Sequence, residues 1–228
     1  MDPARPFITF YDDATGERVE LSFATFENWV NKTANLIEDG LLAEPGQRIA
    51  LLLPVHWQTL VWYLACWSAG VIAAPGLDPA AANHVITDSQ SLARALACPG
   101  DRVLMSLRPL GGRSLEPLPP GVLDYAVEVP GHGDRFVPLH PVAPDDPALE
   151  IAGRTWTGAE IVAAAEKAAA DLSRADRILT STDPATWAGL TTVLLGPLAA
   201  GASVVLCRNP DPDRIAARTT MERITRTA

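Results

Sequence analysis

Short, uninterrupted apolar runs that alternate with helical patterns constrain the fold of this chain more than any other feature of its sequence. The runs RIALLL (48–53), VIAAP (71–75) and SVVLCR (203–208) have the length of single strands and show no alternation of polar and apolar residues. Strands of this kind are buried on both faces, which is typical of parallel sheets covered by helices. The pattern therefore predicts an α/β fold with one or two largely parallel sheets and flanking helices.

Helical patterns fill most of the gaps between these runs. Apolar residues at helical spacing follow the strand pattern RVELSF, and an alanine-rich stretch begins near residue 158. The expected helices are a first one carrying Phe26, Val30, Ala34, Ile37 and Leu41, then 57–70, 89–96, about 158–173, about 184–200 and one from about 211. The other expected strands are 18–23, 84–87, 102–107, 122–129, 148–151 and 177–181.

Charge and composition exclude several classes of protein. The 228 residues include 27 acidic and 18 basic side chains, so the net charge is −9. Such a surface repels phosphate backbones and anionic lipids, which argues against nucleic-acid and membrane partners. The most apolar stretch, Leu60–Pro75, is shorter than the ~20 residues of a membrane span. With no basic, apolar leader at the start and three widely spaced cysteines, we expect a cytoplasmic protein without disulfides or a metal site.

Residues 107–147 differ from the rest of the chain because proline and glycine interrupt them throughout. The segment is too apolar for a free linker, so it is expected to form loops packed on a sheet. We therefore predict one α/β domain over residues 1–228, with 107–147 as a candidate subdomain boundary.

Three segments in the same order resemble the adenylate-forming (AMP-binding) superfamily of acyl-CoA synthetases and ligases. They are LSFATFENWVNKTANLI (21–37), RIALLLPVHWQTLVWYLACWSAGVIAAPG (48–76) and DRILTSTDPATWAGLTTVLLGPLAAGASVVL (176–206). The resemblance implies the fold of the N-terminal subdomains of such an enzyme. It also implies that the remaining parts of those enzymes, including a small C-terminal lid with its lysine, have no counterpart among these residues.

The resemblance places a phosphate-binding loop, rich in Ser, Thr and Gly and ending in Pro-Lys-Gly, just before the helix near residue 160. Small residues let backbone N–H groups approach the phosphates, and the lysine adds positive charge. The sequence there is IAGRTWTGAEI, with Arg154 as its one cation and no lysine. Thr157 and Glu160 fit a capping box at the start of a helix. This favours a structural turn over a degenerate phosphate site.

A second position also departs from the superfamily. Trp187 stands where the resemblance implies a histidine near the acyl and nucleotide site. Unlike a histidine, a tryptophan cannot act as a general acid or base. Asp183 and Pro184 have a structural use as a helix N-cap followed by proline. No catalytic residue is assigned. A surviving ligand pocket is expected near Pro184, Trp187 and Gly189, with Arg154 as the nearby cation.

These observations lead to three functional hypotheses. The first is a truncated, catalytically inactive homologue, a pseudoenzyme that binds a protein partner or retains weak acyl or nucleotide binding. The second is an acyl-CoA synthetase or ligase activity completed by a second polypeptide. The third is a structural homo-oligomer. No cofactor is expected to be required. ATP or AMP with Mg²⁺ is expected to bind only if a nucleotide site survives.

Overall fold

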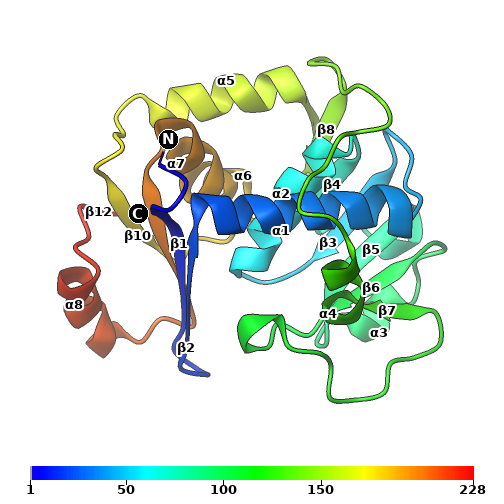
Figure 1. Cartoon of the computed structure of the whole chain (residues 1–228), viewed down its shortest axis with the longest axis horizontal. Helices are drawn as coiled ribbons and strands as arrows, with labels where there is room; N and C mark the ends of the chain where they lie inside the picture. The colour runs from blue at the N-terminus through cyan, green and yellow to red at the C-terminus, as the bar shows by residue number, and fades with distance from the viewer. Residues whose placement is uncertain (1) are drawn as a thin grey trace. The chain divides into compact units, whose positions relative to one another are not determined.

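The computed structural model describes residues 2–228, which form two compact units (Figure 1). Unit one comprises residues 2–27, 55–57 and 160–228, and unit two comprises 28–54 and 58–159. The proline- and glycine-rich segment 107–147 lies inside unit two, and the chain passes between the units near residues 27, 54–58 and 159.

Unit one is built on a five-stranded sheet in the order β12-β10-β11-β1-β2. All neighbouring strands are parallel except β1 and β2, which form an antiparallel hairpin. The strands are β1 (Pro6–Asp12), β2 (Glu17–Ser22), β10 (Arg177–Thr180), β11 (Ser203–Arg208) and β12 (Arg226–Thr227). The helices that follow in this part of the chain are α5 (Gly158–Ala169), α6 (Trp187–Leu190), α7 (Gly196–Ala200) and α8 (Pro212–Met221), with a π-helical turn at Thr191–Leu195 between α6 and α7.

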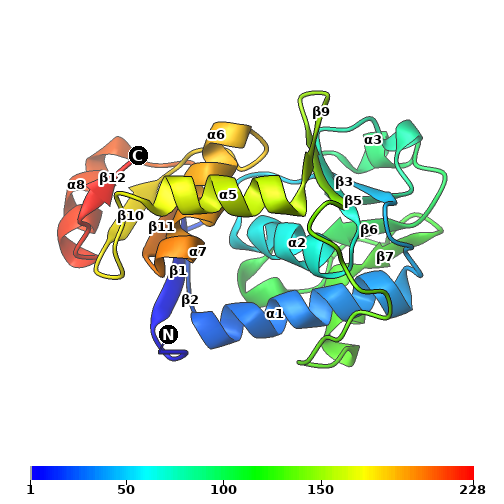
Figure 2. The same ribbon diagram turned by 90° about the horizontal axis from the view of Figure 1, so that it is seen from above.

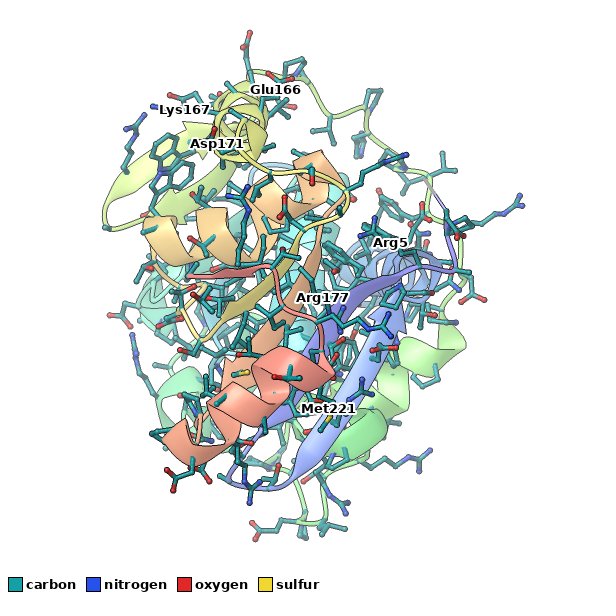
Figure 3. All side chains as sticks on the ribbon, turned by 90° about the vertical axis from the view of Figure 1, so that its left-hand side faces the viewer. Arg5, Glu166, Lys167, Asp171, Arg177 and Met221 are labelled. Carbon is teal, nitrogen blue, oxygen red and sulfur yellow. The ribbon has the colours of Figure 1, made fainter. Side chains whose placement is uncertain are left out.

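Helices cover both faces of this sheet, and its inner strands β10, β11 and β1 are buried along nearly their whole length. On one face Leu179, Val205 and Cys207 pack with Ile215 of α8. Ile178, the neighbour of Leu179 on β10, points to the opposite face, toward the region of Thr191 and Gly196. Figure 3 views unit one from the side that carries α8, with Arg177 of β10 and Met221 at the end of α8 labelled.

Unit two is built on a seven-stranded sheet in the order β7-β6-β5-β3-β4-β8-β9. The strands are β3 (Arg48–Leu52), β4 (Ile72–Pro75), β5 (His84–Asp88), β6 (Arg102–Met105), β7 (Val122–Asp124), β8 (Pro147–Ile151) and β9 (Arg154–Thr157). Only the pair β8 and β9 is antiparallel. The associated helices are α1 (Phe23–Asn35, continued by a π-helical turn at Leu36–Gly40), α2 (Trp57–Ser68), α3 (Leu92–Ala95) and α4 (Tyr125–Glu128).

Tyr125 is fully buried in the core of unit two. Its hydroxyl lies 2.7 Å from the Thr33 hydroxyl, and its ring lies 5.5 Å from the ring of Trp62 and 6.3 Å from that of Trp29. Small residues fill a second cluster, where Ala95 and Cys98 pack with the strand residues Ala50, Leu52 and Val85.

The predicted α/β class with mostly parallel sheets is confirmed, but three strands were missed. The sequence patterns predict no element for the residues of β1, a turn for those of β9, and a helix from about 211 in the region that contains β12. The expected strand 122–129 is wrong in its second half: Asp124 ends β7, and its carboxylate accepts the N–H of Ala126 at 2.9 Å to cap α4. The helix expected over 158–173 is α5, which ends earlier, at Ala169.

His56 of unit one makes the stability of the fold depend on pH. The side chain is buried against the ring of Phe10, with 4.5 Å between ring centroids. Burial, together with the charge of Arg208, lowers the pKa of His56 to about 3. The imidazole of the unfolded chain takes up a proton near pH 6.5. The stability that the neutral, buried His56 contributes is therefore fully present above that pH and is lost as the pH falls toward 3.

We expect the free energy of unfolding to drop by roughly 2–3 kcal/mol more in the wild type than in a His56→Phe variant between pH 7 and pH 4.5. Phenylalanine keeps an aromatic ring beside Phe10 but cannot take up a proton. Urea unfolding at a series of pH values checks this. If the free energy of unfolding falls equally with pH in the two proteins, His56 is protonated at its ordinary pKa in the folded state.

Candidate functional site

A cavity of about 390 Å³ opens at the carboxyl ends of β10 and β11 in unit one. The chain leaves β10 toward α6 and leaves β11 toward α8, and these connections run to opposite faces of the sheet. In open α/β sheets this is the place where ligands bind. The lining residues are Leu179, Thr180, Ser181, Cys207, Pro210, Pro212, Ile215, Thr227 and Ala228.

The chemistry of this cavity suits an apolar group better than a reaction. Burial raises the pKa of the Cys207 thiol, so the thiol stays protonated and is a poor nucleophile. The Thr180 hydroxyl lies 2.9 Å from the hydroxyl of Thr182. Sequence reasoning missed this cavity, although the rule that ligands bind at the carboxyl ends of parallel strands pointed to residues 179–181.

A second cavity of about 440 Å³ lies on the other face of the same sheet. Its one charged lining residue is Arg226, whose Nε is 3.0 Å from the Asp176 carboxylate. The other lining residues are Ala168, Leu172, Ile178, Thr191, Thr192, Gly196, Pro197, Thr227 and Ala228.

The structure brings Pro184, Trp187 and Gly189 together on one tight turn in unit one, but none of them lines either of these two cavities. The turn is built around Thr186, whose hydroxyl accepts the N–H of Gly189 at 3.1 Å and donates to the carbonyl of Asp183 at 2.9 Å. Thr186 is therefore the N-cap of α6, and the predicted Asp183–Pro184 cap is wrong. Asp183 instead accepts the N–H of Ala185 within the turn.

Arg154, the fourth predicted site residue, belongs to unit two. It begins β9, the edge strand of the sheet, and its guanidinium lies 3.4 Å from the centroid of the Trp156 ring. This stacking is a favourable cation–π contact.

A hairpin occupies the place where the phosphate loop was expected (Figure 2). β8 turns into β9 through Ala152 and Gly153, whose φ angles of +50° and +77° fit the tight two-residue turn of a hairpin. β9 then runs directly into α5, with Thr157 at the position before the first helical residue. The sequence-based preference for a structural turn over a phosphate loop agrees with this geometry.

The first N–H groups of α5 already have partners within the protein. Gly158 donates to the carbonyl of Asp146 at 3.1 Å, and Ala159 donates to the carbonyl of Pro144 at 2.7 Å. Free N–H groups at a helix start are what binds phosphate. At α5 two of these donors are already used.

Comparison with known proteins identifies the family. Residues 1–108 match the family model described as AMP-binding enzyme. A Mycobacterium tuberculosis protein named "TIGR03089 family protein" is 43% identical over 234 residues, covering 99% of this chain and 92% of that protein. The chain belongs to the TIGR03089 family.

Solved structures show which fold this TIGR03089 family member has. An acyl-CoA synthetase from Brucella canis superimposes with a TM-score of 0.79 at 20% identity, over 98% of this chain and 44% of the enzyme. A benzoate CoA ligase from Burkholderia xenovorans gives a TM-score of 0.76 at 21% identity, over 99% of this chain and 47% of the ligase. The chain thus has the N-terminal fold of adenylate-forming enzymes and spans about half the length of these two.

A charged cluster in unit one of this TIGR03089 family member surrounds Glu222. The buried carboxylate of Glu222 accepts hydrogen bonds from Tyr11, Arg18 and Arg177. Burial alone raises the pKa of Glu222, but these donors outweigh it and lower the pKa below its usual range. A carboxylate held ionised by three donors binds the end of α8 to the sheet and is a weak general base.

Two further features bear on function. Within residues 2–228, no group of three or more His, Cys, Asp or Glu side chains is arranged to hold a metal ion. None of the helices in the described part of the chain combines the length and the apolar character that crossing a bilayer requires.

Proposed function

We propose that this TIGR03089 family member is a catalytically inactive relative of the adenylate-forming acyl-CoA synthetases, a pseudoenzyme that acts by binding a protein partner. One observation carries the proposal: the β8–β9 hairpin and the occupied N–H groups of Gly158 and Ala159 stand where a phosphate loop is expected. With two of the first N–H groups of α5 already used and no lysine in the hairpin, the triphosphate of ATP lacks the donors and the charge that hold it in a phosphate loop.

The expected result is that the purified chain neither binds nor turns over ATP. Calorimetric titration with ATP and Mg²⁺, and then with AMP, should give no saturable heat corresponding to a Kd tighter than about 1 mM. A cooperative thermal transition of the same sample serves as the control for folding. Saturable heat near one equivalent, or exchange of pyrophosphate into ATP, would contradict the proposal.

A second candidate is an adenylate-forming activity completed by another polypeptide. It is favoured by the coverage, since more than half of each of the two matched enzymes has no counterpart in these 228 residues. This candidate predicts that a separate chain with the missing part restores pyrophosphate exchange on mixing. Because it requires a nucleotide site in the assembled complex, exchange only in the mixture would favour it over the pseudoenzyme.

A further inference from the structure

Prolines recur every third residue in the segment that joins α4 to β8. The sequence RFVPLHPVAP (135–144), here called the proline strap, places Pro138, Pro141 and Pro144 at equal spacing, with Arg135 three residues before the first. A polyproline II helix has three residues per turn, so these four side chains share one edge when the strap is extended. Proteins that read such peptides use grooves lined with aromatic side chains.

The strap is exposed except at the half-buried Phe136. Every residue from 137 to 145 is exposed, and the aliphatic side chains of Val137, Leu139 and Val142 have 82%, 73% and 42% of their surface accessible. Three exposed aliphatic side chains and three exposed prolines thus lie within eight residues of chain, which makes this an apolar segment of the surface. Figure 1 shows this segment as a bare green tube that crosses α1 before it reaches β8.

Hydrogen bonds hold both ends of the strap. At its start, Asn31 donates to the carbonyl of Asp134 and Asn35 donates to the carbonyl of Arg135, at 3.0 and 2.9 Å. At its end, Pro144 accepts the N–H of Ala159. A segment fixed at both ends loses less conformational entropy on binding than a free peptide does.

The middle of the strap is bent, and a hydrogen bond to Glu38 lies at the bend. The N–H of Leu139 donates to Glu38 at 2.8 Å, and the chain bends at Leu139 and His140. A groove that reads the whole strap must straighten this bend, which breaks that hydrogen bond. Glu38 therefore opposes binding.

We propose that the proline strap is a docking site for a protein with an aromatic-lined groove that reads polyproline II segments and carries an acidic side chain for Arg135. The inference rests on the proposed partner-binding role and names the chemistry of the partner. The two proposals can be tested separately. ATP turnover by the chain would contradict the partner-binding role, and absence of binding in the titration below would contradict the docking site.

The test titrates the full chain into an isolated SH3 domain selected for R-x-x-P-x-x-P peptides and measures the heat of binding by calorimetry. We expect saturable 1:1 binding that weakens about tenfold in a Pro138→Ala/Pro141→Ala variant. Glu38→Ala should strengthen binding severalfold, because it removes the hydrogen bond that must break before the strap can straighten. If Glu38→Ala leaves the affinity for the SH3 domain unchanged, the role of Glu38 is only structural, which contradicts the proposed straightening of the strap.

The matched control is Pro117→Ala/Pro120→Ala, which alters two exposed prolines at the same spacing but with Ser114 in place of the arginine. This variant should bind the probe as the wild type does. Absence of binding, or equal loss in both double variants, overturns the proposal. So does a change of oligomeric state in Pro138→Ala/Pro141→Ala by sedimentation, which would assign the strap to a second copy of the chain.

Discussion

Replacing Arg218 by methionine should lower the free energy of unfolding by about 3–5 kcal/mol, the usual result of leaving one member of a buried ion pair alone. Arg218 of α8 contacts both carboxylate oxygens of Asp13, at 2.6 and 3.1 Å. Only 6% of each side chain is exposed. Without the guanidinium, the Asp13 carboxylate stays buried with a backbone N–H from Asp211 as its remaining short contact at 2.8 Å.

The arginine also packs against its surroundings. Its guanidinium lies 4.1 Å from the centroid of the Tyr11 ring and 3.3 Å from the sulfur of Cys207. Methionine retains part of this packing, so most of the loss should come from the unpaired charge. We would measure it by urea unfolding at pH 7, with the secondary structure followed by circular dichroism.

Two variants separate charge from packing. Arg214→Met removes a cation that is 58% exposed and 3.8 Å from Asp13, and should cost less than about 1 kcal/mol. The double variant Asp13→Leu/Arg218→Met removes both charges and should recover much of the loss. A double variant as unstable as Arg218→Met would show that packing, and not the ion pair, holds α8.

The second large effect is expected at Gly189. A Cβ atom added there would lie 1.9 Å from the carbonyl oxygen of Asp183 and 2.6 Å from its carbonyl carbon. Backbone atoms cannot move aside as the end of a side chain can, so the turn that holds Thr186 must open. Gly189→Ala should therefore destabilise the protein by about 3 kcal/mol or more.

Thermal unfolding of Gly189→Ala beside Gly131→Ala gives the measurement. A Cβ at Gly131 would meet nothing within 4 Å, so that variant should stay within about 0.5 kcal/mol of the wild type. Equal stability of the two variants would mean that the turn accommodates a side chain. Gly189 would then be available again as a ligand-binding residue whose role in the fold is minor.

The hairpin at Ala152 and Gly153 shows how far local sequence reasoning reaches. The lack of lysine and of a Ser/Thr-Gly cluster predicted a structural turn there, and this needed only neighbouring residues. The strand β9 was missed, because it forms only by pairing with β8 and its side chains are half-buried or exposed. β12 was missed for the same reason: its two exposed residues are strand only beside β10.

The candidate site could be predicted only in part. Pro184, Trp187 and Gly189 lie on one local turn, so their proximity was readable from the chain. The cavity beside them in sequence, at residues 179–181, is also lined by Cys207, Pro210, Pro212, Ile215, Thr227 and Ala228. The pairing of parallel strands brings these residues to the same end of the sheet. Those contacts depend on strand order, and strand order leaves no mark in a local pattern.

The sequence by itself determined the α/β class, the buried central strands and most helices, because burial on both faces of a strand requires an uninterrupted apolar run. It also determined that the superfamily's phosphate loop is missing. Only the tertiary structure decided the two sheets, the cavities and the Asp13–Arg218 pair, whose members are 205 residues apart. The physical reason is that such contacts are selected by how whole strands and helices pack, while a pattern records only what each segment buries.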